Sequence, residues 1–211
     1  MFPRIFLAAL AALAVMPVQA QTIISVTGPN AFYATTGVYT SWTQTGSFSG
    51  VTIQAYLYSG GGTATGTAYL VTQVGPGATS AQQIGAAAPI SVTSETPVAT
   101  TLFTNLTLGP GTYYLVISRT TDLRWSMNTT AQSGIVTAAG VTSNPIAFAA
   151  PVAGYPPAST WVMKSGTSAF FSAAGGTVTT SVPVLSPAAM LAMALMLLTS
   201  GLLLMRKYRL Q

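Results

Sequence analysis

The chain contains neither cysteine nor histidine, and only 4% of its 211 residues are charged, whereas about 25% are charged in an ordinary soluble domain. The lack of cysteine excludes disulfides, thiolate nucleophiles and thiolate metal ligands. The lack of histidine removes the commonest general base and the commonest neutral metal ligand, and it excludes a Ser–His–Asp triad. We therefore expect a protein that holds no cofactor and no metal.

Acidic residues are too few for carboxylate chemistry. The body of the chain has only Glu95, in "TSETP", and Asp122, in "RTTDLR". Acid–base catalysis would need these carboxylates to form a pair, and calcium usually takes several, so a weak structural calcium site is the remaining alternative. Asp122 lies between Arg119 and Arg124, which predicts a surface salt bridge. A Ser–Lys dyad would depend on Lys164 alone, and we expect the protein not to be an enzyme.

The formal net charge of +5 belongs mainly to the ends of the chain. Four of the seven cations lie there, namely Arg4, Arg206, Lys207 and Arg209. Between residues 21 and 205, three cations (Arg119, Arg124, Lys164) against two acids (Glu95, Asp122) leave a charge of +1. Nucleic-acid binding needs clustered Lys and Arg, so nucleic acid is not an expected partner. A surface with so little charge favours self-association.

The first twenty residues have the composition of a secretory signal peptide. Arg4 supplies a short cationic region, and residues 5–16 form an apolar run too short to span a bilayer comfortably. Val18 and Ala20 are the small residues of a cleavage site, which makes Gln21 the first residue of the mature chain. An uncleaved N-terminal anchor is the alternative.

Residues 187–205 predict a single transmembrane helix. The segment is uncharged and mostly apolar, and as a helix it spans roughly 28 Å, close to the thickness of the hydrocarbon core. Arg206, Lys207 and Arg209 follow it, which predicts a cytoplasmic C-terminus and an exported body. The expected organisation is a signal peptide (1–20), a β-domain (21–173), a linker with a sorting motif (174–186), the helix (187–205) and a basic tail (206–211).

A proline-bracketed hexapeptide, "VPVLSP", precedes that helix. It comprises Val182, Pro183, Val184, Leu185, Ser186 and Pro187. The prolines hold it extended, the form in which proteases bind peptides. With the helix and the basic end, this segment resembles the bacterial C-terminal sorting signals of the PEP-CTERM and IPTL-CTERM type. That resemblance implies handling by an exosortase-like membrane protease; an ordinary anchor that is never cut is the alternative.

The body reads as short strands and turns. In "GVTIQAYLYSGG" (50–61), the apolar residues Val51, Ile53, Ala55 and Leu57 alternate with polar or tyrosine side chains. This period of two predicts a strand with one buried and one wet face. Further strands are expected over 66–77, 100–127, 144–150 and 168–173, and no long segment has a helical period. Residues 175–181 form either a last strand or a flexible linker.

Glycine-rich turns are expected to join these strands as hairpins. The segment 102–119 predicts the clearest hairpin, turning at Gly109, Pro110 and Gly111, and "GGGTATG" (60–66) predicts another hairpin connection. Several short strands at such spacing favour an all-β fold, an antiparallel sandwich of jelly-roll type.

Aromatic residues are the main candidates for ligand binding. Tyr56 and Tyr58 share the polar side of their strand, and they and Trp161 are candidates for rings exposed to a carbohydrate. Ordinary packing is the alternative for all three, because aromatic residues are common in strands. Trp42 and Trp125 are expected in the core.

Three stretches of the body, "SWTQTGSFSGVTIQAYL" (41–57), "GTAYLVTQVGPG" (66–77) and "TTLFTNLTLGPGTYYLVIS" (100–118), resemble an uncharacterised family of secreted PEP-CTERM-type proteins. The resemblance implies a β-domain at the cell surface and no established chemistry. We expect a structural or adhesive protein of the envelope or biofilm matrix, with exopolysaccharide as a candidate partner. The alternatives are a carbohydrate-binding module and a single-pass protein anchored with its body in the periplasm.

Overall fold

The computed structural model describes residues 20–28, 37–128, 134–149, 154–164 and 167–177. The predicted signal peptide before Ala20, the sorting motif 182–187, the membrane helix 187–205 and the basic tail 206–211 lie outside these residues. Among the described residues, no helix combines the length and apolar composition needed to cross a membrane.

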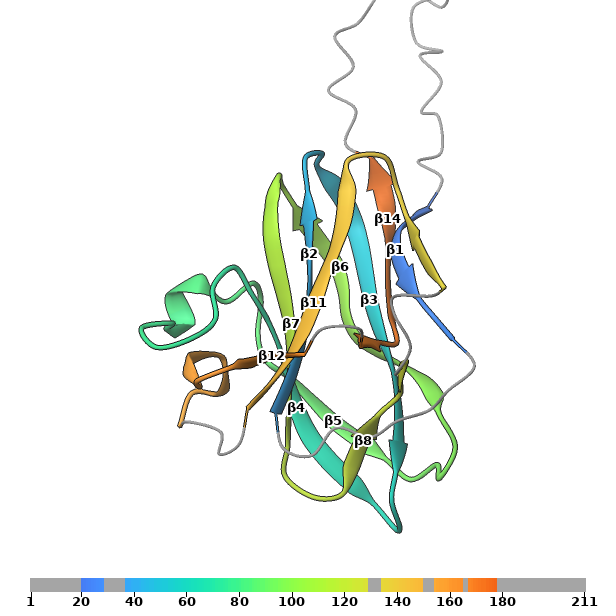
Figure 1. Ribbon diagram of the computed structural model, residues 1–211. Helices are drawn as coiled ribbons and strands as arrows, with labels where there is room; N and C mark the ends of the chain where they lie inside the picture. The colour runs from blue at the N-terminus through green and yellow to red at the C-terminus, as the bar shows by residue number, and fades with distance from the viewer. Residues whose placement is uncertain (1–19, 29–36, 129–133, 150–153, 165–166, 178–211) are drawn as a thin grey trace, which may run out of the picture. The chain divides into compact units, whose positions relative to one another are not determined.

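The described body consists of two large antiparallel sheets (Figure 1). Sheet A has the order β10 (Ile135–Thr137), β1 (Gln21–Val26), β14 (Phe171–Thr177), β3 (Phe48–Ser59), β6 (Val98–Leu108), with β8 (Leu123–Trp125) also paired to β3. Sheet B has the order β12 (Val162–Lys164), β11 (Val141–Ala149), β2 (Gly37–Gln44), β7 (Gly111–Arg119), β4 (Ala64–Val71), β5 (Ala88–Val92). A small sheet joins β13 (Ser168–Ala169) to β9 (Met127–Asn128). The expected all-β, antiparallel class is confirmed.

The core lies between sheets A and B and follows the period of two. In β3, Val51, Ile53, Ala55 and Leu57 are all fully buried, while the residues between them are partly exposed. One cluster of buried apolar side chains draws on both sheets, including Leu115 of β7. Each large apolar side chain buried there stabilises the fold by about 1.5–3 kcal/mol. The prediction of one buried and one wet face is therefore confirmed for this strand.

The expected hairpin around Gly109 and Pro110 is wrong. Strand β6 pairs with β3 in sheet A, whereas β7 pairs with β2 and β4 in sheet B. The turn is an arch that carries the chain from one sheet to the other. Alternation could not reveal this, because Leu108 and Leu115 face one common core from opposite sheets, and their burial pattern is the same in a hairpin and in an arch.

A buried glutamine holds this arch in place. The Gln44 amide donates to the carbonyls of Leu108, at 3.2 Å, and Gly109, at 2.9 Å. Its oxygen accepts from the Trp42 indole N–H at 3.0 Å, and the Tyr113 hydroxyl donates to the Gly109 carbonyl at 2.7 Å. Side chains therefore satisfy the carbonyl of Gly109, which lies outside the strands, and supply a donor to that of Leu108 at the end of β6.

The connection over residues 60–63 is also an arch, because β3 and β4 belong to different sheets. The expectation of a hairpin at "GGGTATG" is therefore wrong for the same reason. The connection packs against the β7–β8 turn, where the Gly60 N–H donates to the Asp122 carbonyl at 3.0 Å.

Both ends of the described body lie at the same end of sheet A. Gln21, at the start of β1, is paired opposite Gly175, near the end of β14, and Figure 1 shows the start of β1 beside the end of β14. Strand β14 continues to Thr177. The predicted domain boundary at 173 was therefore too early, because residues 174–177 complete the sheet. Residues 175–181 were expected to be either a last strand or a flexible linker, and the strand is confirmed as far as Thr177.

Candidate functional site

The outward face of sheet B carries a row of apolar and aromatic side chains. Residues directly opposite each other in a ladder share a face, and the register aligns Met163, Ala147, Tyr39, Val116 and Tyr69 across five strands. Tyr39, Ala147 and Val116 belong to a small apolar cluster separate from the main core. The row therefore stands on the outside of the sandwich.

Aromatic rings gather around Tyr39. Its ring meets Tyr114 edge to face, with centroids 5.3 Å apart and planes at 87°. It meets Trp161 at 5.0 Å and 70°. Edge-to-face pairs add about 0.5–1.5 kcal/mol beyond the area they bury. Tyr39 is buried by these neighbours, whereas Tyr114 and Trp161 remain partly exposed.

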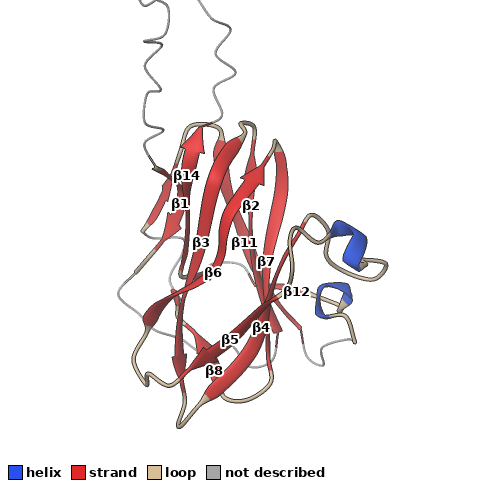
Figure 2. Ribbon diagram, turned by 180° about the vertical axis from the view of Figure 1, so that it is seen from behind, coloured by secondary structure: helices blue, strands red, loops and turns tan. Residues whose placement is uncertain are grey.

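Two connections stand beside this face and bond to each other. Figure 2 shows their short 3₁₀ helices, η2 (Ser80–Gln82) and η3 (Pro156–Ala158), side by side. The Gly75 N–H donates to the Pro157 carbonyl at 2.8 Å. The Tyr155 hydroxyl donates to Gln83 Oε1 at 3.1 Å, and the Tyr155 ring meets Tyr69 at 5.7 Å. The connections are thereby fixed to each other and to the sheet.

Local sequence explains how these connections fold. Thr79 caps η2 by accepting from the Ala81 N–H at 3.3 Å, while its own N–H donates to Gln82 Oε1 at 2.8 Å. This reciprocal arrangement is the capping box. Proline fixes φ at the first turn of η3. The Trp161 indole N–H then donates to the Pro157 carbonyl at 3.2 Å, which orients the ring.

Burial changes the acidity of two tyrosines here. Burial raises the pKa of the Tyr39 hydroxyl, and the neighbouring Tyr114 raises it further. Burial, with a smaller contribution from Tyr69, also raises the pKa of Tyr155. Both hydroxyls are therefore neutral donors at physiological pH, and the Tyr39 hydroxyl donates to Met163 Sδ at 3.1 Å.

Hydroxyl and amide groups continue the face beyond the rings. Thr43 and Thr112 are opposite each other in β2 and β7, and their hydroxyls are 2.9 Å apart. The Asn144 amide donates to the Thr43 hydroxyl at 3.2 Å. These groups are partly exposed, so the face combines ring surface with hydrogen-bonding groups.

The structure does not bring the three predicted ligand-face aromatics together. Trp161 lies on the outward face of sheet B. Tyr56 and Tyr58 belong to β3 of sheet A and alternate with its buried residues, so they face outward on the opposite side of the sandwich. Tyr58 lies under the Arg124 guanidinium, 5.9 Å from its ring centroid. Trp42 and Trp125 are in the core, as expected.

The sequence pattern did not identify Tyr39, Tyr69, Tyr114 and Tyr155 as members of an aromatic group. Alternation in β7 did separate Tyr114 from the apolar parity of its strand. The grouping itself needed the strand register, because the four residues come from β2, β4, β7 and the approach to η3. Composition carries no signal for that juxtaposition.

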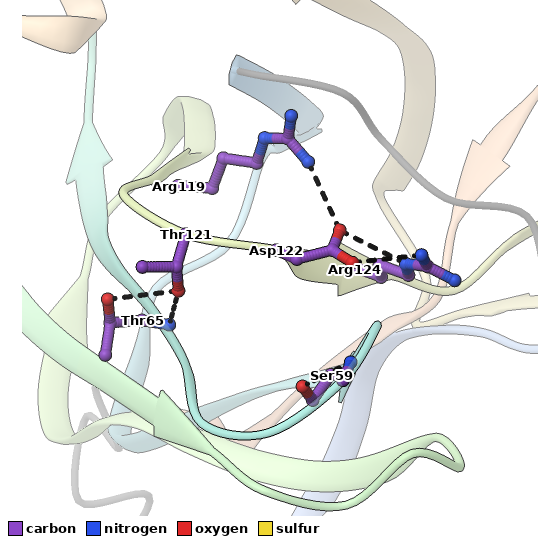
Figure 3. Close-up of polar contacts among 7 residues, drawn as sticks. Ser59, Thr65, Arg119, Thr121, Asp122 and Arg124 are labelled. Atoms are coloured by element: carbon purple, nitrogen blue, oxygen red, sulfur yellow. Dashed lines mark hydrogen bonds and ion pairs between the residues drawn. The ribbon is translucent and has the colours of Figure 1, made fainter.

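The predicted salt bridge at Asp122 is confirmed (Figure 3). Its carboxylate lies 3.0 Å from Arg124 Nη2 and 3.5 Å from Arg119 Nη1. Figure 3 also shows the nearby Thr121 hydroxyl, which accepts from the Thr65 N–H at 2.7 Å. The ion pairs are half-exposed, so they contribute on the order of 0–1 kcal/mol each. Their main role is to order the turn between β7 and β8.

In the described part of the chain, the remaining charged residues do not cluster into a catalytic or metal-binding group. Glu95 is exposed in the turn before β6, and Lys164 ends β12. The described residues contain no group of three or more His, Cys, Asp or Glu side chains that could hold a metal ion. The cleavage residue Val18, the sorting motif 182–187 and the cations Arg206, Lys207 and Arg209 lie outside the described residues, while Ala20 and Gln21 are exposed.

Comparisons with protein-family models, with curated proteins and with solved structures find no match to this chain.

Proposed function

We propose that the chain is the precursor of an exported, non-catalytic surface protein, whose β-domain has a structural or adhesive role in the envelope or extracellular matrix. In this proposal a signal peptide is removed before Gln21. The helix 187–205 then holds the body in the inner membrane, and an exosortase-like protease acts on residues 182–187. The PEP-CTERM and IPTL-CTERM resemblance of the tail is part of the proposal.

The observation that carries the proposal is the extent of the domain. Strand β1 begins at Gln21, the residue that follows the predicted cleavage site, and β14 ends at Thr177, before the motif at Val182. Both strands pair at the same end of one sheet. A body bounded in this way is consistent with removal of both flanking segments, because neither cut would interrupt a strand of the sandwich.

We also propose a jelly-roll topology for the body. The supporting observation is the strand order, in which β1, β14, β3 and β6 are neighbours in sheet A, and β2, β7, β4 and β5 are neighbours in sheet B. Consecutive strands from β1 to β8 change sheet at every step except β4 to β5. Such crossing is typical of two wrapped Greek keys.

The sorting step is tested by changing the prolines of the motif. In the native host, the Pro183→Ala, Pro187→Ala double variant is expected to stay in the inner membrane as the longer form, because the extended peptide is no longer held for the protease. The wild-type body is expected outside that membrane. Pro89→Ala, at an exposed position of β5, is the control and leaves the distribution unchanged.

Retention of the wild-type chain at full length in the inner membrane would support the alternative, a single-pass protein with its body in the periplasm. Equal release of wild type and double variant would contradict the role given to the hexapeptide.

A further inference from the structure

Four strands of sheet B, β11, β2, β7 and β4, carry no charged side chain at their described outward positions. These positions follow from the register, and they include Tyr39, Thr43, Tyr69, Thr112, Tyr114 and Asn144. None of these described side chains is acidic or basic. The ion pairs of Asp122 lie instead at the β7–β8 turn, at the end of the sandwich.

The neutrality of this face narrows the chemistry of an occupant. Nucleic acid and anionic polymers need clustered cations, and adhesion to an anionic membrane surface also depends on Lys and Arg. A neutral polymer does not need cations on the surface that binds it. Its hydrogen-bonding groups can instead be matched by hydroxyls and amides, which this face provides at Thr43, Thr112 and Asn144.

Two tyrosine hydroxyls on the face are available to a ligand. Tyr39 and Tyr155 use theirs within the protein, as donors to Met163 and Gln83. Among the described residues, the hydroxyls of Tyr69 and Tyr114 have no such partner, although both rings are held by edge-to-face contacts. The rings are therefore fixed in orientation while both residues remain partly exposed, an arrangement that lowers the entropic cost of binding.

We propose that this face binds a neutral polysaccharide, with Tyr114 and Trp161 as the stacking rings and with Thr43, Thr112 and Asn144 as hydrogen-bonding groups. The apolar side of a sugar ring packs on an aromatic ring, and its hydroxyls pair with neighbouring polar groups. This inference rests on the proposed adhesive role, since it names the class of matrix component to which the body adheres. It replaces Tyr56 and Tyr58 with residues of the opposite sheet.

Tryptophan fluorescence gives a direct test. Trp42 and Trp125 are 0% and 2% exposed, and Trp161 is the one partly exposed tryptophan of the three in the chain. The full chain, in a detergent without a sugar headgroup, is titrated with dextran, laminarin and mannan, and separately with the anionic polymer alginate. At least one neutral polymer is expected to change the emission, and alginate is not. Trp161→Phe is expected to remove that change.

Matched tyrosine variants locate the site. Tyr114→Ala is expected to weaken binding of the responding polymer about tenfold, the usual effect of truncating a stacking aromatic residue. Tyr58→Ala, on the outward face of sheet A, is expected to leave binding unchanged. Tyr114→Phe and Asn144→Leu keep most of the packing and are expected to weaken binding to a smaller extent, so they decide the matter if Tyr114→Ala unfolds.

The proposal is overturned if none of the neutral polymers changes the emission, if alginate binds as tightly as they do, or if Tyr58→Ala weakens binding as much as the sheet B variants. Its failure is distinguishable from that of the proposed function. A body recovered outside the inner membrane without polysaccharide binding contradicts this inference alone. A chain that binds the polymer but stays whole in the inner membrane contradicts the sorting proposal alone.

Discussion

At the residue scale, a buried polar side chain in this fold satisfies hydrogen-bonding groups that apolar packing would leave without partners. Gln44 is almost fully buried, yet it satisfies the arch carbonyls of Leu108 and Gly109 and the indole of Trp42. The sequence places Gln44 on the same side of its strand as Trp42, so burial of its position was predictable from alternation. Its partners were not predictable, because Leu108 and Gly109 lie in the arch between β6 and β7, far from Gln44 in the sequence.

The Gln44→Leu variant is expected to lose stability by about 3 kcal/mol, because it removes the partner of the buried Trp42 indole N–H and the amide that donates to the Leu108 and Gly109 carbonyls, of which Gly109 keeps only the Tyr113 hydroxyl. Urea denaturation measures the loss. Gln54→Leu is the matched control, since Gln54 makes a single exposed bond to the Thr101 hydroxyl, and it is expected to change stability by less than about 0.5 kcal/mol. Equal losses in the two variants would show that the Gln44 bonds are not needed.

Tyrosine burial predicts a loss of stability at high pH. Burial raises the pKa of Tyr39, Tyr113 and Tyr155 above the ordinary value near 10. Their contribution is complete below the unfolded pKa and is lost as pH rises through the folded values, because the unfolded chain then releases protons that the folded chain retains. The urea midpoint is expected to fall between about pH 9.5 and 12, and to fall less in Tyr39→Phe. A midpoint independent of pH would contradict this account.

At the element scale, strand identity was predictable and strand partners were not. The period of two in residues 50–61 correctly separated the buried from the exposed residues of β3. The same pattern suggested hairpins at 60–66 and 102–119, where the chain instead crosses between sheets. Alternation records which face of a strand is buried, whereas pairing depends on contacts distant in sequence. The aromatic face of sheet B likewise depends on which strands pair and in which register.

The arch at residues 60–63 depends on the small size of Gly60. A Cβ at this position would collide with the Asp122 carboxylate and the Arg124 guanidinium. Gly60→Ala is therefore expected to displace the partly exposed Asp122 and Arg124 side chains and to lower stability by about 0–1 kcal/mol, the size of the ion pair that it breaks. Gly109→Ala, where a Cβ meets open space, is expected to be nearly neutral. Thermal unfolding of both variants measures the difference, and equal midpoints would rule out this packing role.

At the scale of the whole molecule, low charge and apolar edge strands favour association. Val162 and Met163, on the edge strand β12, are 69% and 56% exposed. Exposed apolar edge strands can pair with other chains, and β12 carries one charged residue, Lys164, at its end. Val162→Lys is therefore expected to reduce self-association of the body in sedimentation velocity. Thr67→Lys, on the doubly paired strand β4, adds the same charge and is expected to have a smaller effect. A wild-type chain that is monomeric at high concentration would contradict the expectation.

The central claim, that the β-domain is released from its two flanking segments, is tested most directly by one measurement. The intact mass of the protein is determined in the inner-membrane and outer fractions of its native host. The account predicts a form in the outer fractions that begins at Gln21 and ends near residues 182–187. A single form ending at Gln211 and confined to the inner membrane would contradict it.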